Sequence, residues 1–177
     1  LLVHLEETIA MAYQMQKDFD SKEKFTFCSI KRKEAIQKYC WNDKNNFFFD
    51  YDFIERKQKK TFTLAGAAPL FFKIATANQA KYIAETIENN FLKPGGVTAT
   101  LVTTGQQWDA PNGWAPLQWM TIIGLENYGY SALAKNIASR WIKLNNDVFK
   151  RTDKLMEKYN VIDTELEAGG GEYKGQD

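Results

Sequence analysis

Apolar side chains recur every three or four residues in most of this chain, and this spacing constrains its fold more than any other feature. In the first segment, Leu2, Leu5 and Ile9 fall on one face of a helix. The same periodicity predicts helices over residues 1–19, 21–41, 65–75, 80–91 and 131–156, and a further one that begins near Trp114. Strands do not alternate with helices, so the pattern predicts an all-α fold. Helical hairpins close into a toroid or extend as a solenoid, and the periodicity leaves both arrangements open.

Two short segments interrupt the helical pattern. Phe47, Phe49, Tyr51 and Phe53 lie on one side of an alternation that predicts a short strand or hairpin. Residues 93–96, Lys-Pro-Gly-Gly, predict the end of the helix before them. We therefore expect a helical chain with one short β segment.

The charge distribution argues against some classes of partner. The chain has 23 Lys and Arg against 22 Asp and Glu, a net charge of +1. Its basic clusters, at residues 31–33 and 56–60, are short enough to be solvated surface. We expect no nucleic-acid partner. No run of about 18 apolar residues occurs, so we expect no membrane partner either.

The cysteines and the histidine carry little chemistry. Cys28 and Cys40 fall on one predicted helix, about 18 Å apart, which is too far for a disulfide. They are predicted to be unpaired, and the sequence leaves both a periplasmic and a cytoplasmic location open. One histidine, His4, without clustered cysteines predicts no metal site. The chain begins without Met, and we expect it to be a piece of a longer polypeptide.

Two glycine-containing stretches carry most of the functional signal. The first, residues 105–116, is predicted to be a loop that leads into a helix, and the second covers residues 167–173. Both place carboxylates, amides or aromatic rings on loops next to helices. Loops on a rigid scaffold are where binding and catalytic residues concentrate.

The side chains of the first stretch suit a sugar. Trp108 and Trp114 offer apolar ring faces, and Gln107 and Asp109 offer groups that pair with hydroxyls. Other interpretations stay open, because a Trp beside a helix is often buried and Asp109 is a candidate turn former or helix cap. Residues 112–113, Asn-Gly, are predicted to make the turn itself.

The order Gln-Trp-Asp-x-Pro-x-Gly-Trp-x-Pro at residues 107–116 resembles a signature of the trehalases, which cleave trehalose into two glucose molecules. The resemblance continues in order through Trp41-Asn42-Asp43, Asp50-Tyr51-Asp52, Pro94-Gly95-Gly96 and the glycine-rich Glu-Tyr end. It implies an (α/α)6 barrel, a toroid of helical hairpins. Residues 1–177 would be the C-terminal part of this single catalytic domain.

The resemblance also implies roles for two glutamates. On its own, Glu157 is one charged position at the end of a predicted helix, where a solvated terminus is the ordinary interpretation. Trehalases carry a Glu-Lys-Tyr segment followed by a glycine-rich run and Glu-Tyr, and the same order stands here. The resemblance implies that Glu157 is the general base and that Glu172 binds substrate.

A second carboxyl group is required for this reaction. Glycosidases use one carboxyl group to protonate the leaving oxygen and another to activate water or attack directly. The general acid of trehalases is an Asp in a Gly-Trp-Asp segment, which this chain lacks, as it lacks the family's arginine clamp. The 177-residue chain alone is therefore predicted to be inactive.

The resemblance favours an inverting trehalase that needs no cofactor. Its expected partners are the disaccharide and the remainder of the same polypeptide. Gln107, Trp108, Asp109, Trp114 and Glu172 would bind the sugar, and Glu157 would act on water. Two alternatives are a non-catalytic sugar-binding or sensor module and a helical-repeat interaction protein without a sugar site. The second predicts no shared cleft for Trp108, Trp114, Glu157 and Glu172.

Overall fold

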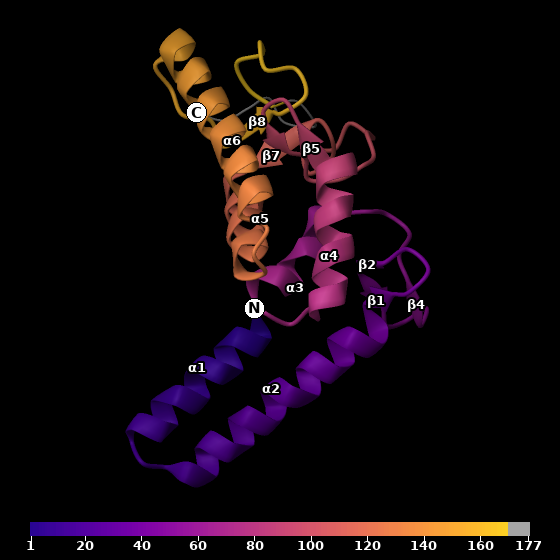
Figure 1. Ribbon diagram of the computed structural model, residues 1–177, viewed down its shortest axis with the longest axis vertical. Helices are drawn as coiled ribbons and strands as arrows, with labels where there is room; N and C mark the ends of the chain where they lie inside the picture. Colours follow the sequence, from indigo (N-terminus) through magenta and orange to yellow (C-terminus); the bar gives the residue numbers. More distant parts are fainter. Residues whose placement is uncertain (170–177) are drawn as a thin grey trace.

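The computed structural model describes residues 1–169 (Figure 1). Its α-helices are α1 (Leu2–Met15), α2 (Phe19–Tyr39), α3 (Ala68–Phe71), α4 (Ala77–Thr86), α5 (Ala115–Asn127) and α6 (Ser131–Thr152). A 3-10 turn, Leu64–Ala67, leads into α3, and a π turn, Ile87–Phe91, extends α4. The predicted helical character is confirmed.

Side chains at the helix starts explain where several helices begin. The Asp18 carboxylate accepts a hydrogen bond from the Ser21 N–H at 3.0 Å and caps α2. Thr76 and Gln79 form a capping box at the start of α4, each side chain accepting the other's backbone N–H. Pro116 lies in the first turn of α5, where its missing N–H costs no helical hydrogen bond.

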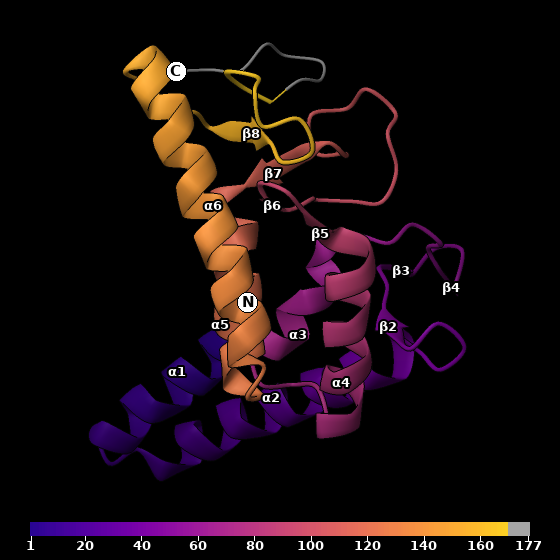
Figure 2. The same ribbon diagram turned by 45° about the horizontal axis from the view of Figure 1, so that its top comes forward.

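The helices form a projecting hairpin and a body (Figures 1 and 2). The antiparallel helices α1 and α2 pack on each other and extend from one end, joined by an ion pair of 2.7 Å between Arg32 and Glu6. In the body, α5 packs against both α3 and α6. The strands β5, β7 and β8 lie at the end opposite the α1–α2 hairpin.

The strands form four separate antiparallel pairs within the described residues. They are β1 (Trp41–Asn42) with β2 (Phe47–Phe48), β3 (Tyr51–Asp52) with β4 (Lys57–Gln58), β5 (Leu92–Lys93) with β6 (Gly96–Val97), and β7 (Asn112–Trp114) with β8 (Lys158–Asn160). The first three pairs are local hairpins. The fourth joins two segments that α5 and α6 separate in the sequence.

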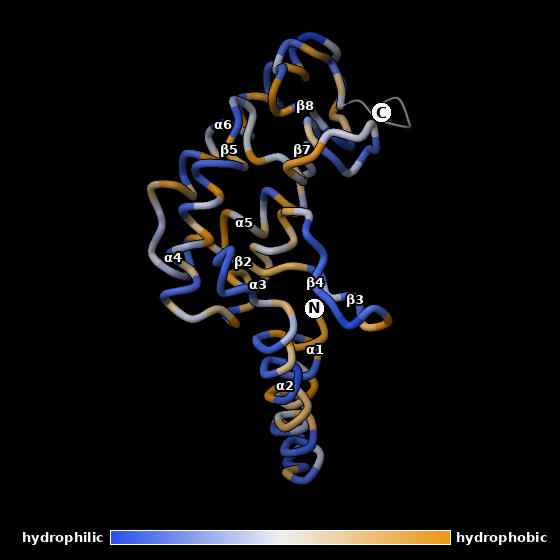
Figure 3. The backbone as a smooth tube through the Cα atoms, turned by 90° about the vertical axis from the view of Figure 1, so that its right-hand side faces the viewer, coloured by the Kyte–Doolittle hydropathy of each residue, from blue (hydrophilic) through white to orange (hydrophobic). Residues whose placement is uncertain are grey.

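The alternation predicted at residues 47–53 is only partly correct. Phe47, Phe48 and Phe49 are all buried, because they enter a core lined on several sides by the helices of the body. Phe53 is 80% exposed, since it lies in the turn between β3 and β4. This hairpin is hydrophilic along its strands and hydrophobic at its tip (Figure 3). The segment therefore holds two hairpins.

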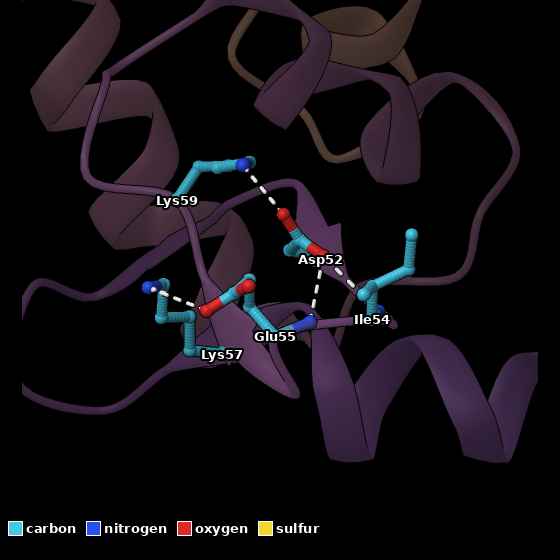
Figure 4. Close-up of polar contacts among 5 residues, drawn as sticks. All are labelled: Asp52, Ile54, Glu55, Lys57 and Lys59. Carbon is cyan, nitrogen blue, oxygen red and sulfur yellow. Dashed lines mark hydrogen bonds and ion pairs between the residues drawn. The ribbon is translucent and has the colours of Figure 1, made fainter.

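Asp52 organises the turn of the second hairpin (Figure 4). Its carboxylate accepts hydrogen bonds from the backbone N–H of Ile54 at 3.0 Å and of Glu55 at 2.9 Å. It also accepts one from the Lys59 ammonium at 2.7 Å. One aspartate thus holds both the tight turn and the strand that follows it.

The last long helix ends earlier than its apolar spacing predicts. We expected helix to Met156, but α6 ends at Thr152 because Asp153 adopts a left-handed conformation with φ of 58°. Residues 154–157 are not helical, and Leu155 is 66% exposed. The chain then forms β8, where a loop was expected from about residue 160. Glu157 therefore lies in a loop before a strand, and not at a helix end.

A small second core supports this region. Leu144 and Val148 of α6 pack with Tyr159 and Val161, which lie in and just after β8. The Trp141 ring meets the Tyr159 ring edge-on at a centroid distance of 5.2 Å. The position of β8 is thus set by α6, as well as by β7.

Cys28 lies within α2 and Cys40 follows its last residue, and both are free thiols. Within residues 1–169, none of the helices is long and apolar enough to cross a membrane.

Candidate functional site

The motif at residues 107–116 occupies the connection between β6 and α5 and the start of α5. It contains strand β7, which pairs with β8 in the register Asn112 to Asn160, Gly113 to Tyr159 and Trp114 to Lys158. Residue 157 lies directly before this pairing. The sequence-predicted loop and the sequence-predicted base are therefore brought to the same end of the molecule.

The residues predicted to form the turn, Asn112 and Gly113, belong to β7 instead. The Gly113 position has no room for a side chain, since a Cβ there would lie 2.4 Å from Val161 Cγ1 and 2.9 Å from Gln118 Nε2. Glycine is needed here for the close approach of β7 to the core. The turn prediction failed because Asn-Gly is also compatible with a short strand end.

The two indole rings of the motif stack on each other. Trp108 and Trp114 lie at a centroid distance of 3.8 Å and an interplanar angle of 7°. Trp114 is only 5% exposed and Trp108 is 52% exposed. The core interpretation therefore holds for Trp114, whereas Trp108 has an open ring face that can contact a ligand.

Gln107 is the junction between the loop and the two strands. Its carbonyl oxygen accepts hydrogen bonds from Asn112 Nδ2 at 3.0 Å and from Trp114 Nε1 at 3.3 Å. Its side-chain Oε1 accepts one from the Lys158 ammonium at 3.3 Å. The half-buried carboxamide is thus held between the loop and β8.

The Asp109 carboxylate holds the loop together. Oδ2 accepts hydrogen bonds from the Thr104 backbone N–H at 3.2 Å and from the Thr104 hydroxyl, and Oδ1 accepts one from Thr100 Oγ1 at 3.4 Å. The Asp109 carbonyl also accepts a hydrogen bond from the Asn112 N–H at 3.0 Å. These contacts support the turn-forming interpretation of Asp109. The peptide bond that follows, between Ala110 and Pro111, is cis.

Glu157 is exposed and is fixed through its neighbours. The Met156 N–H donates a hydrogen bond of 2.9 Å to the Tyr159 hydroxyl, which closes the turn around Glu157. The residue after Glu157, Lys158, pairs with Trp114 in the β7–β8 strand pair. Glu172 lies outside the described residues, so five of the six predicted site residues are placed.

Sequence reasoning did not predict Lys158 as a residue of this site, and it predicted Asn112 only as a turn residue. Lys158 and Asn112 are both buried and both bond to Gln107. The sequence predicts a solvated Lys158, because a lysine next to a predicted helix end normally lies in solvent. Its burial depends on the pairing of β7 with β8, for which a single sequence carries no signal.

Other features of the described residues lie away from this site. His4 packs beside Phe72, with ring centroids 6.0 Å apart. Within residues 1–169 no group of three or more His, Cys, Asp and Glu side chains is arranged to bind a metal ion. An apolar cavity of about 520 Å³ lies between α1, α2 and α3, and none of the five predicted site residues that the structure describes lines it.

Comparison with known proteins decides the family. The family model described as Trehalase matches residues 1–177. The chain belongs to the trehalase family. The resemblance seen at residues 107–116 is thereby confirmed.

Relatives within the trehalase family are longer than this chain. The chain is 41% identical over 177 residues to the periplasmic trehalase of Xanthomonas oryzae pv. oryzae (strain MAFF 311018), and the match covers all of this chain and 31% of that protein. The same figures hold for the periplasmic trehalase of Xanthomonas axonopodis pv. citri (strain 306). The chain thus spans about a third of the length of these curated relatives.

Solved structures of other proteins have a similar fold. The chain is similar to neutral trehalase Nth1 from Saccharomyces cerevisiae, with a TM-score of 0.81 and 28% identity over 96% of this chain and 34% of that one. It is also similar to a GH63 mannosylglycerate hydrolase from Thermus thermophilus, with a TM-score of 0.72 and 21% identity. That match covers 97% of this chain and 41% of the hydrolase, and it supports the fold alone.

Proposed function

We propose that this chain is the C-terminal part of a trehalase that hydrolyses α,α-trehalose to two glucose molecules with inversion. Family membership supports the substrate and the reaction. The observation that carries the proposal is the pairing of β7 with β8, which joins the Trp108 loop to the segment that contains Glu157. The loop proposed to bind sugar and the candidate base are therefore joined through one strand pair.

In this proposal Glu157 acts on water. It takes a proton from a water molecule as the oxygen attacks the anomeric carbon of one glucose unit. The general-acid Asp protonates the glycosidic oxygen, and that Asp lies in the part of the polypeptide outside this chain. Inverting glycosidases hold the two carboxyl groups about 6.5–9.5 Å apart, which leaves room for the water. Glu157 is exposed in this chain, so its carboxylate is accessible to water and to substrate.

The sugar would lie against the motif loop. The open face of Trp108 is suited to the C–H groups of a glucose ring, and Trp114 supports Trp108 from behind. Gln107 and Glu172 would pair with hydroxyls. Asp109 contributes by holding the loop in shape, because its oxygens already accept hydrogen bonds from Thr100 and Thr104.

The remainder of the polypeptide would complete an (α/α)6 barrel. Apolar side chains on α5 and α6 remain exposed in this chain, including Trp119, Ile142 and Phe149. Apolar patches of this kind mark surfaces that another part of a protein covers. The relatives named periplasmic favour the periplasm over the cytoplasm as the location of the complete protein.

The proposal is tested in the complete polypeptide by comparing the wild type with Glu157→Gln. This substitution preserves the shape of the side chain and removes the base, so kcat for glucose release should fall about 10²- to 10⁴-fold. Glu165→Gln is the matched control, since Glu165 is an exposed glutamate of the same C-terminal segment. It should leave kcat unchanged.

Proton NMR of the first products tests the stereochemistry. Inversion at one anomeric carbon of α,α-trehalose releases α-glucose and β-glucose in equal amounts, whereas retention releases α-glucose alone. An active wild type with an unaffected Glu157→Gln variant would remove Glu157 from the mechanism. An inactive complete polypeptide would overturn the proposed reaction.

A further inference from the structure

Lys158 is a buried lysine at the centre of the candidate site. It is 1% exposed and lies in β8, directly after Glu157. Lysine is among the residues that are almost never fully buried unless paired. Burying an ammonium costs free energy that only polar partners in a fixed geometry offset. The partners of Lys158 therefore indicate what its charge does.

The ammonium joins two groups of the motif. Lys158 Nζ donates a hydrogen bond of 3.3 Å to Gln107 Oε1. It also lies 5.8 Å from the centroid of the Trp114 ring, within the range of a cation–π interaction. Both groups lie next to Trp108. Gln107 precedes Trp108 in the sequence, and the Trp114 ring stacks on the Trp108 ring. Trp114 Nε1 also donates a hydrogen bond to the Gln107 carbonyl. One charge therefore contacts both supports of the exposed indole.

The backbone and stem of Lys158 join further segments to the same point. Lys158 pairs with Trp114 across the two strands, and its carbonyl accepts a hydrogen bond from the Gly169 N–H at 3.0 Å. A Cβ on Gly169 would lie 2.9 Å from Lys158 Cγ, so the glycine packs tightly on the lysine stem. Gly169 is the first of the three glycines that precede Glu172.

We propose that Lys158 is a positioning residue of the sugar site. Its ammonium fixes the Gln107 carboxamide and the Trp114 ring, and through them the face that Trp108 presents. Its backbone pairs with Trp114 beside Glu157 and accepts the hydrogen bond from the Gly169 N–H. Lys158 is 1% exposed, so this role acts through its neighbours and not through direct contact with the sugar. The kinetic test of this role rests on the proposed trehalase function. The structural test depends only on the contacts of Lys158.

The kinetic test replaces Lys158 in the complete polypeptide. Lys158→Met keeps the length of the stem and removes the charge, and kcat/KM for trehalose should fall about 10- to 100-fold through misplacement of the site. The melting temperature should stay within about 3 °C of the wild type, because methionine fills the same buried space. Lys135→Met, at an exposed lysine of α6, is the matched control and should change neither quantity.

A double-mutant cycle separates positioning from a general loss of structure. If Lys158 acts through Gln107, then Lys158→Met and Gln107→Met are not additive in kcat/KM, and the double variant is within about twofold of the worse single variant. Additive losses, or an unchanged kcat/KM in Lys158→Met, would overturn the proposal. If Lys158→Met does not fold, Lys158→Arg and Lys158→Gln decide. The arginine keeps a cation for Gln107 Oε1 and the Trp114 ring and should lose less kcat/KM than the glutamine, and equal losses would overturn the proposal.

A structural measurement tests Lys158 without any catalysis. In protein labelled with ¹⁵N-tryptophan, Lys158→Met should shift the Trp114 indole N–H signal, assigned by its loss in Trp114→Phe. Lys135→Met should leave that signal in place. An inactive wild type whose Trp114 signal responds to Lys158→Met would overturn the trehalase proposal and keep the positioning role. An active wild type whose Trp114 signal does not respond would overturn the positioning role alone.

Discussion

Trp108 lies nearly parallel to Trp114, with ring centroids 3.8 Å apart, and only Trp108 reaches the surface. The buried ring is fixed by the β7–β8 pairing and by its hydrogen bond to the Gln107 carbonyl. The exposed ring therefore rests on a rigid support, which lowers the entropic cost of presenting it to a ligand. The loop gains a defined aromatic face in this way.

Replacing the exposed ring should weaken substrate binding. We expect Trp108→Ala to raise KM for trehalose about tenfold, equivalent to about 1.4 kcal/mol, through loss of stacking on the sugar. Trp108→Phe should recover part of the loss because it restores a ring face. Phe53→Ala, at an exposed aromatic of the β3–β4 turn, is the control and should leave KM unchanged. An unchanged KM in Trp108→Ala would exclude contact between this ring and the substrate.

Gly113 should be intolerant of even a methyl group. A Cβ there overlaps Val161 Cγ1 at 2.4 Å, and the strand pairing leaves β7 little room to move. We expect Gly113→Ala to lower the free energy of unfolding by about 1–3 kcal/mol, as overpacking does. Thermal melting measures this, and adding Val161→Ala to the variant should recover part of the loss. A melting temperature equal to that of the wild type would show that β7 shifts freely.

The Tyr159 hydroxyl should matter for the loop that carries Glu157. Tyr159→Phe removes the acceptor for the Met156 N–H, at a cost of about 1 kcal/mol in stability. Because the turn around Glu157 then loosens, kcat for glucose release should fall more than KM rises. Tyr13→Phe on α1 is the matched control. If kcat in Tyr159→Phe equals that of the wild type, the hydrogen bond is not needed to place Glu157.

The β3–β4 turn should lose stability in acid. The hydrogen bond from the Glu55 N–H, followed by that from Lys59, holds the pKa of Asp52 below its ordinary value of 3.8. A lowered pKa means that the ionised form stabilises the folded turn above pH 3.8, and that this contribution is lost as the pH falls through the lower folded-state value.

Amide hydrogen exchange of residues 51–58 measures this effect. Protection in the wild type should exceed that in Asp52→Asn near neutral pH, and the difference should shrink below about pH 4. Asp50→Asn, at an exposed aspartate beside the hairpin, retains Asp52 and should show the same protection as the wild type at each pH. A difference between wild type and Asp52→Asn that stays constant into acid would contradict the role of the Asp52 charge.

The helices and the motif loop could be predicted from the sequence because their signals are local. Apolar spacing marks α1, α2, α4 and α5, and the residues between β6 and α5 carry a long motif. The end of α6 could not be predicted, since it depends on the left-handed backbone of Asp153. The apolar spacing predicts that the helix continues past Leu155, but α6 ends at Thr152 and Leu155 is exposed.

The candidate site was predictable by residue but not by arrangement. The sequence predicts the same sugar-binding role for Trp108 and Trp114. The structure shows that Trp114 is buried and supports the exposed ring of Trp108. The burial of Lys158 depends on β8, a strand of three residues. Its partner strand, β7, is separated from it in the sequence by two helices. Such non-local pairing leaves no periodic pattern in a single sequence. The proposed roles of Glu157 and Glu172 come from the family resemblance and not from spacing.

The pairing of β7 with β8 also makes helix length a determinant of the site. Strand β7 leads into α5 and β8 follows α6, and α6 has 22 residues against 13 in α5. Deleting one residue from α6 shortens it by about 1.5 Å and rotates everything after it by about 100°. Insertions and deletions far from any sugar contact would therefore carry Glu157 away from the Trp108 loop. The number of residues in α6 therefore sets where Glu157 lies relative to the Trp108 loop.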